Sequence, residues 1–151
     1  MLNELDKEME KRGLKFVRYA DDCIIMVRSE MSAKRVMRNL TRFIEEKLGL
    51  KVNMTKSKID RPQGLKYLGF GFYFDRQAHQ YKAKPHIKSV AKFKVRTKQL
   101  TCRSLGAENS YKVTKLNQLI RGWINYFKIG SMKYLCREMD KHIRYRLRMC
   151  I

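Results

Sequence analysis

Two adjacent carboxylates, Asp21 and Asp22, lie between two short β-prone runs, residues 16–20 and 23–27. A two-residue polar break between such runs predicts a hairpin, although Asp-Asp is poorer turn chemistry than Asn-Gly. Carboxylates at a hairpin tip suit Mg²⁺, a hard cation that takes oxygen ligands and keeps positions for water and phosphate. Two such ions can clamp the attacking and leaving oxygens of a phosphoryl displacement. An ordinary acidic turn is the competing interpretation, and on the Asp pair alone it is the stronger one.

The chain is strongly basic, and the charge is concentrated in its second half. Its 151 residues include 35 Lys and Arg against 14 Asp and Glu, a formal net charge of +21. Residues 1–75 carry 16 basic and 11 acidic side chains, whereas residues 76–151 carry 19 and 3. A packed domain that repels itself so strongly usually has a polyanion to neutralise it. The second half is therefore predicted to bind nucleic acid, with a merely well-solvated surface as the weaker alternative.

Composition argues against several other classes of protein. Hydrophobic residues make up 44% of the chain, enough for a packed core. No apolar run approaches the roughly 20 residues of a membrane-spanning helix, so no membrane association is expected. The four cysteines show no CxxC spacing and indicate neither a zinc site nor a disulfide framework. Reduced, partly buried thiols in an intracellular protein, cytoplasmic or organellar in a eukaryote, are the expectation.

The segments around the Asp pair predict the elements that must position it. Leu2–Arg12 is expected to form a short helix that ends at Gly13. Residues 31–48 have apolar side chains at helical spacing and predict an amphipathic helix. Residues 65–74 predict an aromatic strand, in which two glycines indicate a bulge or a close approach of another backbone. Residues 81–84 are expected to pair back on it as a short strand.

From Pro85 onward the pattern is helical only. Helices are expected over residues 86–101, 110–129 and 132–149. The second has an apolar stripe that begins at Val113 and includes Trp123 and Phe127, which are interpreted as core. Tyr126, Tyr134 and Tyr145 lie off the stripes and could stack on RNA. Together with the first half, this pattern predicts an α+β fold in which strands and helices precede a three-helix bundle.

Basic side chains of the last two predicted helices lie away from their apolar stripes. The final helix has four of them at helical spacing: Arg137, Lys141, Arg144 and Arg148. The preceding helix has two that also lie away from its stripe, Arg121 and Lys128. A basic face of this kind follows phosphates and supplies salt-dependent affinity without reading sequence. A bundle with a simply charged outer face is the alternative.

Four segments resemble, in order, the motifs of one enzyme family. Phe16–Asp22 resembles the YxDD box of reverse transcriptases, in the YADD form common in group II intron and retron enzymes. The helix 31–48 with Lys51–Lys58 resembles the next palm motif, and Tyr67–Phe70 resembles the primer grip. Arg121–Phe127 is similar to the maturase-specific thumb, often called domain X, which retrons lack. The series resembles the C-terminal part of a group II intron reverse transcriptase/maturase.

This resemblance implies a domain organisation and a function. Residues 1–84 would be the C-terminal part of the reverse transcriptase palm, and residues 85–151 the thumb. The parent enzyme, an RNA-directed DNA polymerase, would copy RNA into DNA by Mg²⁺-dependent nucleotidyl transfer. It would also bind intron RNA and assist its splicing. The implied partners are therefore intron RNA, an RNA template and a DNA primer.

The resemblance also implies roles at the YADD box. Asp21 and Asp22 would be the catalytic, metal-binding carboxylates. Tyr19 and Ala20 would contact the primer–template near the incoming nucleotide.

Two further positions take implied roles. Lys56 aligns best with the palm lysine proposed to protonate the pyrophosphate leaving group. Lys58 is its rival, and a solvated basic residue is the alternative for either. Leu68 and Gly69 would support the primer end, although plain sheet core explains the surrounding run equally well.

The expected catalytic set is incomplete. Only 20 residues precede Asp21, too few for the fingers or for the further aspartate that the family draws from an earlier strand. Asp6, Asp60 and Asp75 have no context that supports this role. The chain by itself is therefore expected to be inactive. Exposed strand edges should pair with the missing N-terminal part or with a second copy. A non-catalytic RNA-binding maturase remnant is the alternative, whereas an unrelated DNA-binding protein leaves the motif order unexplained.

Overall fold

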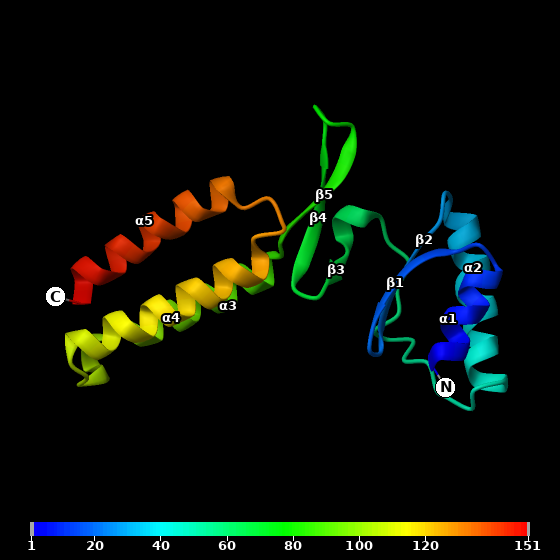
Figure 1. Cartoon of the computed structure of the whole chain (residues 1–151), viewed down its shortest axis with the longest axis horizontal. Coiled ribbons are helices and arrows are strands. Elements are labelled where there is room, and N and C mark those ends of the chain that lie inside the picture. The colour runs from blue at the N-terminus through cyan, green and yellow to red at the C-terminus, as the bar shows by residue number, and fades with distance from the viewer. Residues whose placement is uncertain (1, 151) are drawn as a thin grey trace. The chain divides into compact units, whose positions relative to one another are not determined.

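The computed structural model describes residues 2–150 and divides the chain into two compact units, Met1–Asp60 and Arg61–Ile151. Each unit combines helices with a small antiparallel sheet (Figure 1), so the predicted α+β class is confirmed. The division by contacts falls at residue 60, whereas the boundary between the two family domains, expected at residue 84, stays a prediction.

Unit 1 is a hairpin packed on two helices. Its elements are α1 (Leu2–Lys11), β1 (Lys15–Tyr19), β2 (Asp22–Met26) and α2 (Glu30–Glu46). The core consists of four buried apolar residues: Leu5 and Met9 from α1, Leu40 from α2 and Leu48 from the segment just after it. Phe16 and Ile25 of the hairpin pack against them. Helix α2 begins where predicted because the Ser29 hydroxyl caps it, accepting from the Ser32 amide at 3.2 Å.

The hairpin turn lies one residue earlier than the sequence suggested. Tyr19 pairs with Asp22 across the hairpin, so the two turn residues are Ala20 and Asp21, and Asp22 is the first residue of β2. The predicted break at Asp21–Asp22 is therefore wrong by one position. Ala20 takes the left-handed conformation that the first position of such a turn requires, with φ of 51°.

Unit 2 joins a three-stranded sheet to three long helices. Its elements are a 3₁₀ turn (Pro62–Gly64), β3 (Lys66–Tyr67), β4 (Phe70–Asp75), β5 (Gln80–Pro85), α3 (Ile87–Leu100), a second 3₁₀ turn (Arg103–Leu105), α4 (Asn109–Phe127) and α5 (Lys133–Cys150). The sheet order is β3-β4-β5. The single strand predicted over 65–74 is wrong, because a turn at Leu68–Gly69 folds β3 back on β4. The aromatic run hid this turn, since its apolar pattern continues across it.

An aromatic cluster joins the sheet of unit 2 to its helices. The Phe127 ring lies 4.9 Å from that of Phe70 and 4.7 Å from that of Trp123, which in turn lies 5.1 Å from Phe93. The interpretation of Trp123 and Phe127 as core is confirmed for Phe127, which is buried, and Trp123 packs beside it. Val113 is 49% exposed, so the predicted stripe is buried only in its later part.

All four cysteines are free thiols. Cys23 and Cys136 are exposed, so the expectation of partly buried thiols is wrong for these two. Cys102 and Cys150 are half-buried, as expected.

Candidate metal and nucleic-acid sites

The end of hairpin β1–β2 brings together the four residues of the YADD box. Tyr19 and Asp22 face each other across the two strands, and Ala20 and Asp21 close the turn. Because side chains alternate along a strand, Tyr19 and Asp22 share the outer face with Val17, which is opposite to the face packed on the helices. Both carboxylates are exposed, and Tyr19 is 65% exposed. The site is thus open on the side where Tyr19 lies.

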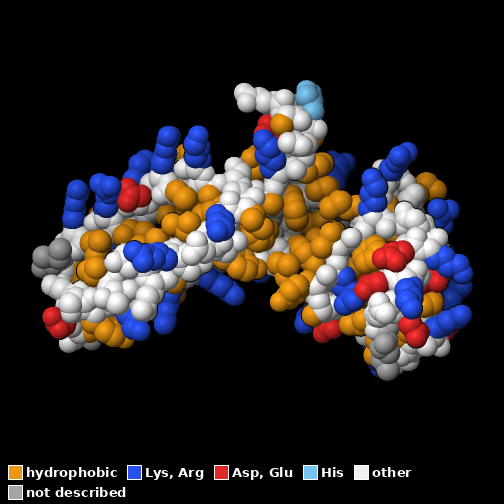
Figure 2. All heavy atoms as spheres, in the orientation of Figure 1, with side chains coloured by type: hydrophobic (Ala, Val, Ile, Leu, Met, Phe, Trp, Pro, Cys, Tyr) orange, Lys and Arg blue, Asp and Glu red, His pale blue; other side chains and the backbone are white. Residues whose placement is uncertain are grey.

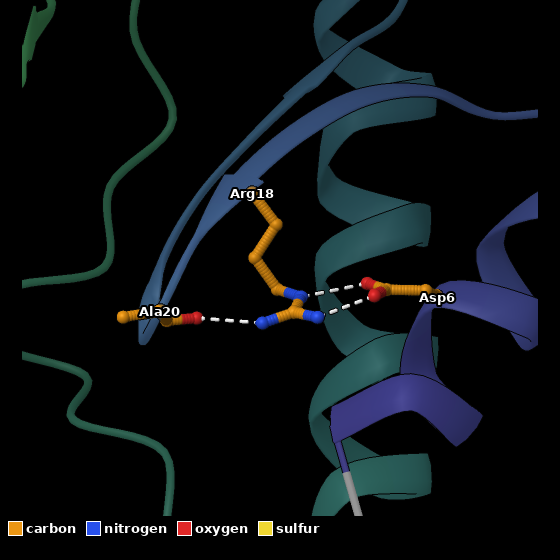
Figure 3. A network of polar contacts seen from close by, with 3 residues as sticks. All are labelled: Asp6, Arg18 and Ala20. Atoms are coloured by element: carbon orange, nitrogen blue, oxygen red, sulfur yellow. Dashed lines mark hydrogen bonds and ion pairs between the residues drawn. The ribbon is translucent and has the colours of Figure 1, made fainter.

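An arginine clamp fixes this turn to α1 (Figure 3). The Arg18 Nε donates to Asp6 Oδ1 at 2.7 Å, and a second guanidinium nitrogen binds the other Asp6 oxygen. The third nitrogen donates to the Ala20 carbonyl at 2.9 Å. A planar guanidinium suits this fork geometry, so the clamp holds the backbone immediately before the two carboxylates. It lowers the pKa of Asp6 and raises that of Arg18, which keeps both groups charged.

The clamp was missed by sequence reasoning, which considered Asp6 only as a spare metal ligand. Asp6 and Arg18 lie on different elements, and their spacing of 12 residues matches no helix or strand period. A basic residue beside the YADD box was the only signal, and it does not identify its partner.

Two carboxylates at an exposed turn form a donor set that suits Mg²⁺. This ion is commonly held by one or two carboxylates together with water and substrate phosphates. Within residues 2–150, no cluster of three or more His, Cys, Asp or Glu side chains is placed to hold a metal. The three other carboxylates considered are in ion pairs instead: Asp6 with Arg18, Asp60 with Lys58 at 2.8 Å, and Asp75 with Lys82 at 2.6 Å. Asp21 and Asp22 therefore fit the ion as a partial site.

Lys56 lies in an exposed turn that follows α2. The Asn53 side-chain oxygen accepts from the amides of Thr55 and Lys56 at 3.1 and 3.2 Å and so fixes the backbone. The Lys56 side chain is exposed. Its rival Lys58 forms the exposed ion pair with Asp60. Because an exposed ion pair of this kind is weak, both lysines could approach a substrate, and the choice of Lys56 stays a prediction.

The Leu68–Gly69 turn is anchored to the helices of unit 2. Its two residues have φ of 48° and 82°, the left-handed pair of a type I′ turn. The Gly69 carbonyl accepts from the His86 amide at 2.9 Å and from the Ser89 hydroxyl at 2.8 Å. The Tyr126 hydroxyl donates to the Leu68 carbonyl at 2.9 Å. The Tyr126 hydroxyl is thus used within the fold, whereas stacking of its side chain, which is 53% exposed, on RNA stays a prediction.

The predicted phosphate contacts are exposed on α4 and α5. On α5, four exposed basic residues occupy one face: Arg137, Lys141, Arg144 and Arg148. Figure 2 shows Lys and Arg side chains along this helix. Lys141 pairs with Glu138 at 3.1 Å and Arg144 with Asp140 at 2.9 Å. Such exposed pairs are worth only ~0–1 kcal/mol, so a phosphate can replace the carboxylate. Arg121 and Lys128 are exposed on α4.

Comparison with known protein families gives two matches, one in each half of the chain. Residues 1–72 match the reverse transcriptases, RNA-dependent DNA polymerases, and residues 90–151 match the group II intron maturase-specific domain. The chain is 34% identical over 133 residues to the putative COX1/OXI3 intron 2 protein of Saccharomyces cerevisiae. The aligned region is 85% of this chain and 15% of the yeast protein, so the chain spans a small part of that relative's length.

The hairpin with its adjacent carboxylates lies in the segment that matches polymerases, and the helical unit carries the maturase match. These two features define the class as a member of the reverse transcriptases that carries a group II intron maturase-specific domain. The chain belongs to the reverse transcriptase/maturase family of group II introns, as its sequence motifs predicted. Within residues 2–150 no helix is long and apolar enough to cross a membrane.

Proposed function

We propose that this chain supplies the metal-binding end of a palm and the RNA-binding thumb of an enzyme that copies RNA into DNA and assists splicing of its intron RNA. One observation carries the proposal. Asp21 and Asp22 lie at the exposed end of hairpin β1–β2, within the segment that matches reverse transcriptases. Adjacent acidic side chains that are held at a hairpin end and left open to substrate are suited to phosphoryl transfer.

In this proposal each residue of the hairpin end has a role. Asp21 and Asp22 hold Mg²⁺, which when bound supplies the positive charge that neutralises phosphate oxygens during nucleotidyl transfer. Arg18 holds the turn through the Ala20 carbonyl. Tyr19, on the same outer face as Asp22, contacts the primer–template.

The remaining roles fall outside the hairpin. Lys56 donates a proton to the leaving pyrophosphate, a role its exposed side chain permits. The anchored turn at Leu68–Gly69 supports the primer end, since its three hydrogen bonds to α3, α4 and the residue before α3 keep the backbone in place.

RNA binding in this proposal belongs to unit 2. The exposed basic face of α5, with Arg121 and Lys128 of α4, meets the phosphates of intron RNA or of the template. Unit 2 holds 21 Lys and Arg against 4 Asp and Glu, so long-range attraction to a polyanion acts over the whole unit.

A protein partner is proposed for unit 1. The sheet β1–β2 has only two strands among the described residues, and its outer face exposes Val17 and Met26 at 56% and 57%. Such a sheet favours pairing with the N-terminal part of the enzyme or with a second copy. Light scattering should show association at rising concentration, and a clean monomer throughout would contradict self-association.

A non-catalytic RNA-binding maturase is the second candidate. It is favoured by the ion pairs of Asp6, Asp60 and Asp75, which leave Asp21 and Asp22 as a two-carboxylate set within residues 2–150. Two carboxylates offset the charge of two divalent ions less well than three do.

A complementation assay separates the two candidates. The purified chain is tested for primer extension on an RNA template, alone and mixed with the N-terminal half of a related enzyme. The catalytic proposal expects no extension by the chain alone and Mg²⁺-dependent extension by the mixture. A mixture that forms a complex and binds RNA but does not extend the primer supports the non-catalytic maturase. Robust extension by the chain alone would show that the catalytic set is already complete.

A further inference from the structure

Unit 2 contains a cavity of about 640 Å³ that none of the roles above uses. It lies where β4 and β5 meet the first turns of α3 and α5, and we call it the α3–α5 cavity. Its lining includes six residues that matter here: Tyr73, Lys84, Ile87, Lys94, Ser131 and Tyr134. The volume falls within the roughly 300–1,000 Å³ that is usual for binding sites of small ligands.

The apolar wall of this cavity is open to solvent. Ile87 is 82% exposed and Tyr134 is 77% exposed, each at the start of its helix. Large apolar side chains that stay in water beside a concave surface indicate contact with a ligand. A flat ring and an aliphatic side chain are surfaces on which an unstacked base packs.

Positive charge surrounds this wall. The Lys84 Nζ lies 5.5 Å from the centroid of the Tyr73 ring, and Lys94 adds a second exposed ammonium group. None of the lining residues is acidic. The Ser131 and tyrosine hydroxyls supply donors and acceptors for a base edge. A neutral apolar protein segment would fill the wall but leave both lysines without an anion, whereas a nucleotide satisfies both features.

We propose that the α3–α5 cavity binds one unpaired base of single-stranded RNA. Tyr134 and Tyr73 are the stacking surfaces, and Lys84 and Lys94 meet the phosphates on either side of that base. The occupant is single-stranded because a base must leave its duplex stack before an aromatic side chain can pack on its face. The inference rests on the proposed RNA binding by unit 2 and adds to it a site that depends on base exposure as well as on charge.

The test compares Tyr134→Ala with Tyr111→Ala in the whole chain. Tyr111 is the control, because it is 51% exposed in the first turn of α4, does not line the cavity and is not among the proposed RNA contacts. Affinity is measured for a short single-stranded RNA and for an RNA duplex over a range of salt concentrations. Tyr134→Ala should weaken single-strand binding about five- to tenfold, the low end for one stacked base. The duplex affinity and the salt slope should not change, because stacking releases no counterions.

Further variants separate stacking from folding and from general RNA binding. Tyr134→Phe keeps the ring and should bind like the unaltered chain, and circular dichroism should show each variant folded. Photo-crosslinking of a 4-thiouridine-containing single strand should place the adduct on β4, β5 or the start of α5. If the unaltered chain binds RNA but Tyr134→Ala matches Tyr111→Ala, this proposal is overturned while the proposed function stands. If Tyr134→Ala loses binding to the N-terminal part of the enzyme while its RNA affinity stays intact, the cavity binds a protein segment and not RNA. No RNA binding by the unaltered chain overturns both.

Discussion

The two hairpin turns at predicted nucleic-acid contacts are held in different ways. The Ala20–Asp21 turn of unit 1 is tied to α1 through charge, because the Arg18 guanidinium connects the Ala20 carbonyl to Asp6. The Leu68–Gly69 turn of unit 2 is tied to its helices by neutral hydrogen bonds and aromatic packing. A turn that carries carboxylates is thus braced by a cation behind it, whereas the uncharged turn is braced by close packing.

The same difference extends to the surfaces of the two units. Unit 1 has 14 Lys and Arg against 10 Asp and Glu, and unit 2 has 21 against 4. Acidic side chains lie among basic ones over unit 1, whereas basic side chains dominate unit 2 (Figure 2). Charge in unit 1 therefore serves largely to position its elements. Charge in unit 2 is left in excess, and a polyanion is the partner that would neutralise it.

The largest expected effect comes from removing the carboxylates of the charged turn. In a complemented, polymerase-active mixture, Asp21→Asn and Asp22→Asn should each lower DNA synthesis about a thousandfold or more, because metal ions supply several kcal/mol of charge stabilisation. RNA affinity should stay nearly unchanged, because these residues belong to unit 1 and are not among the basic residues proposed to meet phosphates. Primer extension and RNA binding are measured on the same preparations. Synthesis that survives Asp21→Asn would remove the basis for the catalytic assignment.

The next effect contrasts the basic helices of the two units. Replacing the four basic residues of the α5 face with Gln should reduce the log–log salt slope of RNA binding by about 3 units, or roughly 60-fold in affinity over a fourfold salt change. Gln is a comparable helix former, so the fold should survive. The altered residues are Arg137, Lys141, Arg144 and Arg148.

Helix α2 offers a matched control for this experiment. It also presents four exposed basic residues, two of which pair with acidic neighbours as on α5: Lys34, Arg35, Arg38 and Arg42. Their replacement with Gln should change the slope much less. Equal losses from both helices would mean that RNA affinity follows total charge and not the α5 face. An unchanged slope in the α5 variant would move the RNA site elsewhere on the chain.

Glycine substitutions contrast the backbones of the two turns. Gly69→Ala should destabilise unit 2 by about 1–3 kcal/mol, because φ is left-handed and an added Cβ would lie 3.2 Å from Ser89 Oγ and 3.3 Å from Phe127 Cζ. Ala20→Gly should stabilise unit 1 slightly, since relief of ~1–2 kcal/mol of strain exceeds the ~0.5–1 kcal/mol entropic cost of glycine. Gly13→Ala is the control for strain without crowding, as its Cβ would meet nothing within 4 Å. Equal losses at positions 69 and 13, measured by denaturant unfolding, would contradict the close packing.

The sequence predicted those parts of the fold that have a regular period. A polar break between two β-prone runs marked the β1–β2 hairpin, and helical spacing marked α2, α4 and α5, with ends displaced by one or two residues. The Leu68–Gly69 turn was missed because aromatic residues continue across it. The adjacent carboxylates and the basic face were recognisable because their residues are close in sequence.

The other parts of the candidate sites depend on contacts between distant residues. The Asp6–Arg18 clamp joins a helix to a strand, and the α3–α5 cavity joins Tyr73 to Tyr134. Neither pair has a spacing that any local pattern encodes. Packing of whole elements decides such contacts, so they could not be predicted from periodicity or composition.

The smallest expected effect is a difference in how the two units respond to acid. The pKa of His142 in unit 2 is lowered by burial and by the charges of Lys94 and Arg146. When the pKa of a group is lower in the folded protein than in the unfolded chain, the unfolded chain takes up the proton first as the pH falls. The folded state is therefore fully stable with respect to this group above the unfolded pKa, about 6.5 for His, and loses stability as the pH falls from there through the folded pKa. The pKa of Asp6 in unit 1 is lowered by Arg18, so the same reasoning places its loss below an unfolded value of about 3.9. Unit 2 should therefore begin to lose stability at a higher pH than unit 1.

Hydrogen exchange, followed separately for amides of each unit between pH 7 and pH 3, measures this difference. His142→Gln removes the titrating imidazole, so unit 2 should no longer lose stability near pH 6.5, and unit 1 should be unchanged. The substitution breaks no hydrogen bond of the buried imidazole Nε2, which has no partner among the described residues. Asp6→Asn should lower the stability of unit 1 at neutral pH and flatten its response to acid, since the charged clamp is already broken. A common midpoint for both units, unmoved by either substitution, would mean that these groups do not set their acid response.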